Sequence, residues 1–319
     1  MLGQPLHAFT MPRVSVIIPA FNAATFILLT LRHALLSSYK DFEIVIVNDG
    51  STDDLLAILQ GCDPRVRVIS QPNRGMSAAR NLGIEYSDSE YIALLDSDDI
   101  WHPEKLTAQV SLMDARPDVG LCFGEFRAWD GIAPIVFPDG VNPESIVSEL
   151  SGWIYHKLVL VSWALPSTLL FRRDVISNLG PFLTEDSQTD DWEFVIRASR
   201  HYQFAKLAAV IALYRQHPAQ LSKKLRKKNP EREMRETMIS KYGMTGPNGQ
   251  PVELAELNKR RYASELAFGA SHLEVGELAV GFECIVRAAR LKPLDRRAYL
   301  AAPKALAKRM LRYAELIQG

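Results

Sequence analysis

The sequence predicts an α/β protein with a mostly parallel, Rossmann-like sheet flanked by helices, followed by a helical C-terminal extension. Over the first 120 residues, short apolar runs rich in Val and Ile alternate with segments whose apolar residues have helical spacing. A cluster of polar residues directly follows each apolar run. The last third of the chain is instead rich in Ala, Leu and Arg. Strands that alternate with helices at this spacing predict βαβ units and hence parallel strands.

The first part of the chain contains four strands and four helices in alternation. We expect strands at residues 14–18, 42–47, 66–69 and 91–95. We expect helices at residues 23–38, 53–59, 75–86 and 103–116. Ser51 or Asp53 is a suitable cap for the second helix, and Pro103 suits the first position of the fourth.

The rest of the chain loses this alternation. Residues 120–130 and 163–173 have the composition of strands and are separated by a Pro- and Gly-rich stretch. Residues 189–200 predict a helix capped by Thr189, because acidic residues fill its first turn. Residues 223–233 resemble a linker, and residues 265–295 resemble a single tetratricopeptide-type helical hairpin. We therefore expect a lead-in (1–12), a main domain (13–222, with halves 13–118 and 119–222) and a helical extension (223–319).

Composition and charge are those of an ordinary soluble globular protein. Of its 319 residues, 47% are hydrophobic and 23% charged, and 37 basic residues balance 37 acidic ones. From residue 223 onward there are 20 Lys and Arg against 11 Asp and Glu, which leaves 17 against 26 before it. The basic final third is consistent with an anionic neighbour such as a membrane surface or nucleic acid, and equally with a solvated helical surface.

Cysteine usage and hydropathy indicate the cytoplasm. The three cysteines, Cys62, Cys122 and Cys284, are far apart, which argues against a zinc site and a disulfide framework. No apolar run approaches the roughly 18 residues of a membrane span. The first residues lack the charged and apolar regions of a secretory signal. We expect a cytoplasmic protein whose basic helices offer peripheral contact with the inner membrane face.

The polar clusters after the four strands converge on one crevice. They occupy residues 19–22, 48–51, 71–75 and 96–99. In open α/β sheets, ligands bind outside the carboxyl ends of the strands, and all four clusters lie there. This edge of the sheet is therefore the expected site.

Three of these clusters have residue types that suggest a ligand. Asp96, Asp98 and Asp99 suit Mg²⁺ or Mn²⁺ held together with substrate phosphates, although an acidic helix-capping turn has the same composition. Asp49 beside a glycine is either a plain turn or an acceptor for a base or ribose group. Arg74 and Arg80 near a helix N-terminus suit a phosphate, and Arg80 equally suits a helix surface.

Five segments in order resemble one known family. VSVIIPAFN, IVIVNDGSTD, NRGMSAARNLGI, YIALLDSDDIWHPEKL and LGPFLTEDSQTDDWEF are similar to motifs of the family 2 glycosyltransferases, which have the GT-A fold. The resemblance covers residues 14–222. It implies that Asp49 contacts the nucleotide base and that Asp98 binds a divalent cation, with Asp99 as an extra acid. The implied nucleotide-sugar site consists of Pro19, Ala20, Asn22, Asp49, Arg74, Gly75, Arg80, Asp96 and Ser97.

The resemblance also implies the remaining roles. Asp191 corresponds to the general base, and its neighbours Asp190 and Trp192 position the acceptor, where the family commonly has Glu-Asp-Trp. His217, in Tyr-Arg-Gln-His, joins Asp96 and Asp98 near the cation. A base without a covalent nucleophile implies inversion at the sugar carbon.

The expected function is metal-dependent transfer of a sugar from a nucleotide-diphosphate sugar, with a UDP-sugar favoured. The acceptor is a carbohydrate, a lipid-linked or a protein-linked glycan in the synthesis of cell-surface polysaccharide, lipopolysaccharide or glycoconjugates. We expect Mn²⁺ or Mg²⁺ as cofactor, no nucleic-acid partner, and a homodimer as one arrangement of the helical extension. Two alternatives are a nucleotidyltransferase-like enzyme, against which the absence of a Gly-rich loop after the first strand argues, and a non-catalytic nucleotide-binding scaffold.

Overall fold

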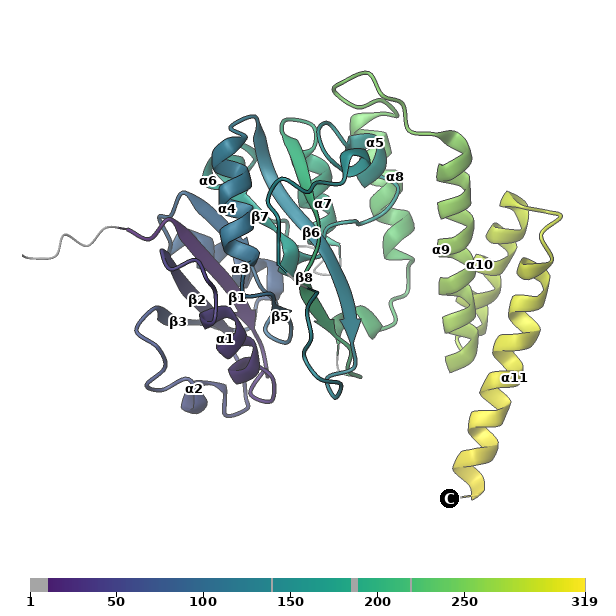
Figure 1. The fold of residues 1–319 in the computed structure, drawn as a ribbon. Helices are drawn as coiled ribbons and strands as arrows, with labels where there is room; N and C mark the ends of the chain where they lie inside the picture. Colours follow the sequence, from purple (N-terminus) through teal and green to yellow (C-terminus); the bar gives the residue numbers. More distant parts are fainter. Residues whose placement is uncertain (1–10, 139, 185–188, 219, 319) are drawn as a thin grey trace, which may run out of the picture. The chain divides into compact units, whose positions relative to one another are not determined.

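The computed structural model describes residues 11–138, 140–184, 189–218 and 220–318, without the side chains of residues 222 and 312–318 (Figure 1). Most of the expected lead-in, residues 1–12, lies outside the described residues. The chain divides into two compact units. The first contains residues up to 154 and residues 164–217, and the second contains residues 155–163 and those from 218 onward. The boundary of the catalytic domain at residue 222 stays a prediction.

The first unit is built on one sheet. Its eight strands, counted over the described residues, follow the order β3-β2-β1-β4-β7-β6-β8-β5. Their bounds are Val14–Ala20 (β1), Phe42–Asp49 (β2), Val66–Gln71 (β3), Tyr91–Leu94 (β4), Ile100–Trp101 (β5), Val119–Trp129 (β6), Leu170–Arg172 (β7) and Gln203–Arg215 (β8). The predicted α/β architecture is confirmed, with all four N-terminal strands present.

The sheet is mixed, with four parallel and three antiparallel pairs among the described strands. Strand β1 runs parallel to β2 and β4, with Val16 opposite Ile44 on one side and Ala93 on the other. Strands β2 and β3 are also parallel, as are β6 and β8. Strand β7 runs antiparallel to β4 and β6, and β5 runs antiparallel to β8. The three N-terminal parallel pairs bring the carboxyl ends of β1, β2 and β4 to the same edge.

Helices flank this sheet. They are α1 (Ile27–Leu35), α2 (Leu55–Ile58), α3 (Met76–Glu85), α4 (Lys105–Ala115), α6 (Arg173–Leu179) and α7 (Asp190–Ala198). Helix α2 has Asp54 as its N-cap without a side-chain cap bond, but the Asp53 carboxylate accepts from the Leu55 amide at 3.3 Å. Of the two caps predicted, Asp53 therefore contacts the start of the helix, whereas Ser51 accepts from the Asn22 amide instead. Pro103 lies ahead of α4, whose N-cap is Glu104, and not at its first position. Thr189 is the N-cap of α7 as predicted, but its side chain makes no capping bond.

Two sheet elements differ from the sequence prediction. Of the strand expected at residues 163–173, only Leu170–Arg172 is extended, because Pro166 begins a 3-10 turn, η2 (Pro166–Thr168). Strand β8, with 13 residues, was not predicted. Its sequence, QFAKLAAVIALYR, contains four alanines and only two β-branched residues, so propensity did not mark it as a strand.

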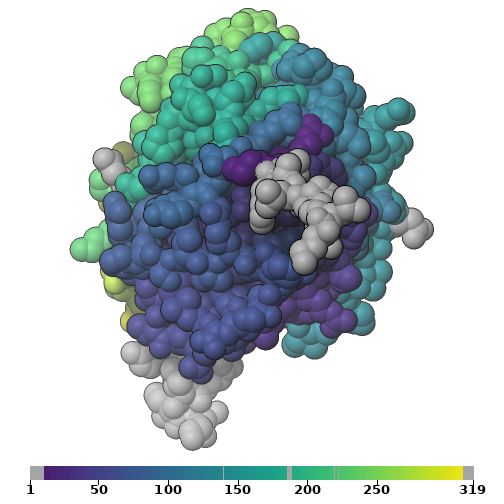
Figure 2. All heavy atoms as spheres, turned by 90° about the vertical axis from the view of Figure 1, so that its left-hand side faces the viewer, coloured from purple at the N-terminus to yellow at the C-terminus, as the bar shows by residue number. Residues whose placement is uncertain are grey.

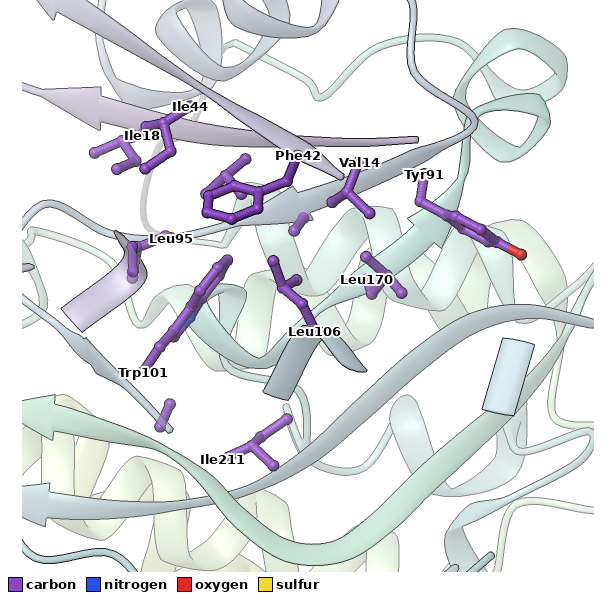
Figure 3. Close-up of a cluster of buried hydrophobic side chains, with 14 of the residues drawn as sticks. Val14, Ile18, Phe42, Ile44, Tyr91, Leu95, Trp101, Leu106, Leu170 and Ile211 are labelled. Atoms are coloured by element: carbon purple, nitrogen blue, oxygen red, sulfur yellow. The ribbon is translucent and has the colours of Figure 1, made fainter. Parts of the chain in front are cut away.

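A continuous apolar core holds the strands in register (Figure 3). Side chains of β1, β2 and β4 pack with residues of β5, α4 and β8. The large members are almost fully buried: Val14, Ile18, Phe42, Ile44, Tyr91, Trp101, Leu106 and Ile211. Because burial of this apolar surface is the main stabilising contribution, the loops at the strand ends are attached to a rigid base. Figure 2 shows the side of the molecule formed by the purple and blue N-terminal part of the chain.

The second unit is helical. It contains α5 (Tyr155–Leu158), α8 (Pro230–Tyr242), α9 (Leu254–Val275), α10 (Leu278–Leu291) and α11 (Arg296–Gln318). The linker predicted at residues 223–233 is wrong in its last part, since α8 begins at Pro230. Asn229 caps that helix by accepting a hydrogen bond from the Arg232 amide. In the part of the chain that the structure describes, no helix is long and apolar enough to cross a membrane.

Candidate active site

The loops after β1 and β2 are joined by side-chain hydrogen bonds. The Asn22 side-chain oxygen accepts from the Thr52 amide at 2.8 Å, and the Asn22 amide donates to the Ser51 hydroxyl at 3.0 Å. Asn22 has a positive φ of 50°, which asparagine tolerates better than most residues. Pro19 and Ala20 are the buried last residues of β1, and they pair with Val47 and Asn48. These bonds fix the edge of the crevice.

Asp49, at the end of β2, organises the loop after β3. Its carboxylate accepts hydrogen bonds from the Gln71 side chain at 2.7 Å and from the Arg74 and Gly75 amides at 2.8 Å. Asp49 is only 3% exposed, so these donors replace water around a buried charge. Gly50 adopts a φ of +73°, and a Cβ there would lie 2.7 Å from the Asn73 backbone nitrogen. The Arg74 side chain is exposed and makes no ion pair within the described residues.

The three carboxylates after β4 have different surroundings. Asp99 is fully buried and accepts from the Ser167 hydroxyl at 2.5 Å and the Arg215 amide at 3.1 Å, which links the loop to η2 and the end of β8. Burial raises the pKa of Asp99 well above its usual range, and Asp98 and Asp96 raise it further by repulsion. Asp99 is therefore a structural carboxyl group in this arrangement. The Ser97 carbonyl accepts a hydrogen bond from Thr30 at 3.1 Å.

Asp98 lies against His217. The Asp98 Oδ2 atom is 2.8 Å from His217 Nε2, and both side chains are partly exposed, at 21% and 16%. The His217 ring packs on Phe26, with 4.5 Å between ring centroids. Burial and the neighbouring Asp96 raise the pKa of Asp98, while His217 lowers it. The structure thus brings together a carboxylate and an imidazole from loops 119 residues apart in the sequence.

This pair fits one side of a divalent cation site. Carboxylate oxygens suit Mg²⁺ and Mn²⁺, and neutral histidine is the commonest protein metal ligand. Within the described residues, no group of three or more His, Cys, Asp or Glu side chains is arranged to hold a metal ion. Substrate phosphates and water would therefore have to complete the coordination, as is usual for Mg²⁺.

Arg80 connects the loop after β4 to the start of α7. It is fully buried, and its guanidinium donates to Asp96 and to Asp190, each at 2.9 Å. Asp190 also accepts from the Ser77 hydroxyl at 2.7 Å. Burial alone lowers the pKa of Arg80, but Asp190 and Asp96 outweigh it and keep the guanidinium charged. The surface-helix alternative for Arg80 is wrong, because this side chain has no exposure.

Asp190 is anchored, whereas Asp191 has few partners. The Asp190 Oδ1 atom is buried and accepts no hydrogen bond in the described part of the chain. Burial raises the pKa of Asp190 despite Arg80. Asp191 is partly exposed, and its only hydrogen bond among the described residues comes from the Trp192 amide at 2.8 Å. Burial of the carboxylate and repulsion by Asp190 raise the pKa of Asp191 to about 7.

Sequence reasoning missed two of the residues that hold this cluster together. The Ser167 hydroxyl accepts from the Asp96 amide at 3.1 Å while donating to Asp99. The Arg215 Nε atom donates to the Asp98 carbonyl at 2.7 Å. The Pro-Ser pair at residues 166 and 167 was the one signal for the first, since proline interrupts a strand there. Arg215 stands two residues before His217, inside a segment that the resemblance already included.

Comparison with known sequences finds matches to the N-terminal part of the chain. The profile described as glycosyl transferase family 2 matches residues 15–134. An uncharacterized glycosyltransferase of Rickettsia felis is 41% identical over 116 residues, which are 36% of this chain and 19% of that protein. Chondroitin synthase of Pasteurella multocida is 35% identical over 152 residues, which are 46% of this chain and 14% of that protein. The matched segments thus span about a fifth or less of these relatives.

Comparison with solved structures gives the fold. Staphylococcus aureus TarS 1-349 in complex with UDP-GlcNAc has a TM-score of 0.60 and 17% identity, covering 95% of this chain and 92% of that one. A mannosyltransferase from Pyrobaculum calidifontis, in complex with GDP-Man and Mn²⁺, has a TM-score of 0.61 and 18% identity, covering 97% and 87%. The sheet order and these neighbours show that the chain has the GT-A fold. The family 2 profile matches residues 15–134, in agreement with the resemblance that the sequence motifs of this part of the chain carry.

Proposed function

We propose that this chain transfers a sugar from a nucleotide-diphosphate sugar to an acceptor hydroxyl, with inversion at the sugar carbon. The observation that supports this most directly is the Arg80 bridge. The Arg80 guanidinium pairs with both Asp96 and Asp190. Asp96 lies two residues from the candidate cation ligand Asp98, and Asp190 directly precedes the candidate base Asp191. The two halves of a displacement reaction, donor binding and acceptor activation, then lie at one edge of the sheet.

Asp191 is the proposed general base. Its carboxylate is partly exposed and has one hydrogen bond among the described residues, so an acceptor hydroxyl can reach it. A pKa near 7 allows it to accept a proton near neutral pH. Asp190 is unsuited to this role because Arg80 and Ser77 hold its Oδ2 atom. Asp190 and Trp192 are proposed to position the acceptor.

The donor is proposed to bind along the loops after β1 to β4. Asp49 holds the Arg74–Gly75 segment in place, and its carboxylate retains a free acceptor direction for the base of the nucleotide. Arg74, exposed at the same edge, suits a phosphate. A divalent cation bound by Asp98, with Asp96 and His217 nearby, would neutralise the charge of the departing diphosphate. Because the site offers a base and no activated nucleophile, one direct displacement with inversion is expected.

The relatives suggest which donor, cation and acceptor this chain uses. The TarS structure is a complex with UDP-GlcNAc, and the mannosyltransferase structure is a complex with GDP-Man and Mn²⁺. We favour a UDP-sugar, Mn²⁺ or Mg²⁺, and an acceptor in cell-surface polysaccharide, lipopolysaccharide or glycoconjugate synthesis. Chondroitin synthase, a polymer-forming relative, supports the polysaccharide class.

The first experiment is thermal unfolding with UDP, GDP, dTDP or CMP, each with Mn²⁺ or with EDTA. A ligand at about 100 times its Kd adds roughly 2.7 kcal/mol, which raises the Tm by a few degrees. Stabilisation by one nucleoside diphosphate, lost in EDTA, supports the donor site. No response to any nucleotide contradicts the proposal.

Two variants then separate transfer from binding. Asp98→Ala should abolish transfer and weaken metal-dependent nucleotide binding, whereas Asp191→Asn should abolish transfer and leave that binding intact. Near-normal turnover by the Asp191→Asn protein would overturn the base assignment. Release of pyrophosphate from a nucleoside triphosphate and a sugar phosphate would instead indicate a nucleotidyltransferase. Nucleotide binding without cleavage of any sugar donor would indicate a scaffold.

A further inference from the structure

The second unit contains a half-open groove between α9 and α11, with a volume of about 520 Å³. In Figure 1 these two helices run alongside α10. The floor of the groove consists almost entirely of small apolar side chains, namely Ala263, Leu266, Ala267, Ala270, Ala301 and Ala305. Cavities of this size are typical of sites for small molecules.

The groove is elongated and has a defined direction. The Arg297 guanidinium of α11 lies 5.7 Å from the ring centroid of Tyr262 on α9, at one end. Lys308 and Glu274 form an ion pair at 2.9 Å at the other end. Between Tyr262 and Glu274, α9 rises by about 18 Å at 1.5 Å per residue. The floor is therefore a narrow apolar strip as long as several helical turns.

Positive charge gathers at the Tyr262 end. The Lys292 ammonium lies 5.2 Å from the Tyr262 ring centroid, and Lys259 lines the groove one turn earlier on α9. Arg297 is paired with Asp295 and Lys259 with Glu256, whereas Lys292 has no ion pair within the described residues. Lys304 lines the middle of the groove and is likewise without an ion pair in the described part of the chain.

The Tyr262 hydroxyl adds a polar group at this end. Tyr262 is 3% exposed, and its hydroxyl oxygen makes no hydrogen bond of standard geometry to the described residues. Burial raises the pKa of Tyr262, and the nearby Asp295 carboxylate and Arg297 guanidinium also act on it, so a ligand oxygen here would lie beside both charged groups. The groove thus combines a polar, cationic end with an apolar strip.

We propose that the α9–α11 groove binds a single-chain anionic amphiphile, with the alkyl chain along the alanine floor and a phosphate or carboxylate headgroup among Lys259, Lys292 and Arg297. The proposal does not depend on glycosyl transfer. A flat membrane surface fits less well, because the apolar side chains line a groove between two helices rather than one convex helix face. Lys259, Arg297 and Lys308 each have a carboxylate partner, so the cations without an ion pair among the described groove residues are Lys292 at the Tyr262 end and Lys304 in the middle. This small unpaired charge suits one headgroup better than the row of carboxylates of an acidic helix.

Titration calorimetry with octyl, decyl and dodecyl phosphate, each below its critical micelle concentration, tests this on the full chain. We expect saturable binding whose affinity rises about fourfold for each added methylene until the groove is filled. Inorganic phosphate alone and a neutral decyl maltoside should bind much more weakly, because each lacks one half of the recognised structure.

Matched variants locate the site. Ala267→Trp, on the groove floor, should reduce decyl phosphate affinity at least tenfold, whereas Ala307→Trp, at an exposed position of α11 outside the groove, should not. Lys292→Glu should weaken binding, and Arg290→Glu, exposed on α10, should not. Ala267 is itself exposed, so its replacement is compatible with folding, and unchanged thermal unfolding will verify this.

Four results would overturn the proposal. The first is affinity that is independent of chain length, or unchanged in the Ala267→Trp protein. The second is binding to anionic phospholipid vesicles but to no monomeric alkyl phosphate, which would indicate a membrane surface. The third is binding of an acidic amphipathic helical peptide in place of alkyl phosphates. The fourth is self-association abolished by Ala267→Trp in sedimentation, which would make a second copy of this chain the occupant.

Discussion

Replacing Arg80 by methionine tests whether the buried guanidinium stabilises the candidate active site by pairing with Asp96 and Asp190. Methionine keeps much of the length and apolar contact of the side chain but removes the charge. The variant leaves Asp190, whose side chain is 1% exposed, with Ser77 as its one hydrogen-bond donor among the described residues. Asp96, at 20% exposure, can still be reached by water. Asp190 therefore dominates the expected loss.

Two estimates of that loss agree. Breaking a buried ion pair by removing one partner typically costs about 3–5 kcal/mol. The variant can instead fold with Asp190 protonated, which at pH 7 costs about 4 kcal/mol, since each pH unit above the ordinary carboxyl pKa of roughly 3.9 adds about 1.36 kcal/mol. Protonation therefore sets an upper limit. Because the pKa of Asp190 is already raised in the wild-type protein, the difference is smaller than this limit, and we expect Arg80→Met to lower the free energy of unfolding by up to about 3 kcal/mol at pH 7.

The same reasoning fixes the pH dependence. In the variant, the folded-state pKa of Asp190 lies above its unfolded value, so the folded state binds more protons and loses stability as pH rises between the two. At pH 5 the cost of protonation falls to about 1.5 kcal/mol. Urea unfolding of both proteins at pH 5, 6 and 7 measures the difference in free energy of unfolding between the wild-type protein and Arg80→Met. This difference should fall to roughly half between pH 7 and pH 5.

Controls make the result specific to the bridge. Arg80→Met combined with Asp190→Asn should recover most of the stability and remove its pH dependence, because the neutral amide no longer needs a cation. Arg13→Met, which breaks exposed ion pairs with Glu90 and Asp114 in the same unit, should cost about 1 kcal/mol or less. A loss at pH 7 no larger for Arg80→Met than for Arg13→Met would refute the reasoning.

Three further outcomes are expected. The kcat/KM for sugar transfer should rise with pH to a plateau above about 7, because Asp191, with its pKa raised to about 7, must be ionised to act as base; a profile flat from pH 5 to 9 would contradict this. Lys105→Met should raise the free energy of unfolding at pH 7, with the difference shrinking towards pH 10. Burial lowers the pKa of Lys105 to about 7 in the folded state, so between pH 7 and pH 10 the unfolded state binds more protons than the folded state. The stability of the wild-type protein therefore rises over this range and approaches that of the variant. Equal urea midpoints of the two proteins at both pH values would refute this reasoning. Gly50→Ala should lower nucleotide affinity in calorimetry and cost about 1–3 kcal/mol of stability, because φ is +73° there and the new Cβ would meet Asn73 at 2.7 Å; wild-type behaviour would show that the loop can shift freely.

The four N-terminal strands were predictable because their information is local. Val14–Ala20 and Phe42–Asp49 are runs of β-branched residues bounded by polar loops, and that pattern alone specifies buried parallel strands. Strand β8 was not predictable in this way. Its extended conformation depends on pairing with β6 on one side and β5 on the other, which overrides the helical propensity of its alanines and leucines.

The same contrast between local sequence information and long-range contacts applies to the candidate site. The residue types and their place at a strand end indicated Asp96 and Asp98 from the sequence, and the family resemblance indicated Asp191 in α7; their roles stay predictions. Their individual environments were not predictable, because Ser167 and Arg215 are contributed by distant segments. The same limit applies to Asp99, whose carboxylate is used inside the protein rather than offered to a ligand.

The distribution of hydrogen bonds among the acidic residues explains why so many carboxylates are present at one edge. The Asp49 carboxylate accepts hydrogen bonds from the Arg74 and Gly75 amides, and the Asp99 carboxylate accepts from the Ser167 hydroxyl and the Arg215 amide. These bonds hold the loop segments of the site in place. Asp98 and Asp191 have few internal donors and remain partly exposed. An ionised carboxylate needs a cation, a donor or water. Asp98 and Asp191, like Asp96, whose carboxylate has Arg80 as its single partner among the described residues, therefore keep oxygens that a cation or a hydroxyl group can reach.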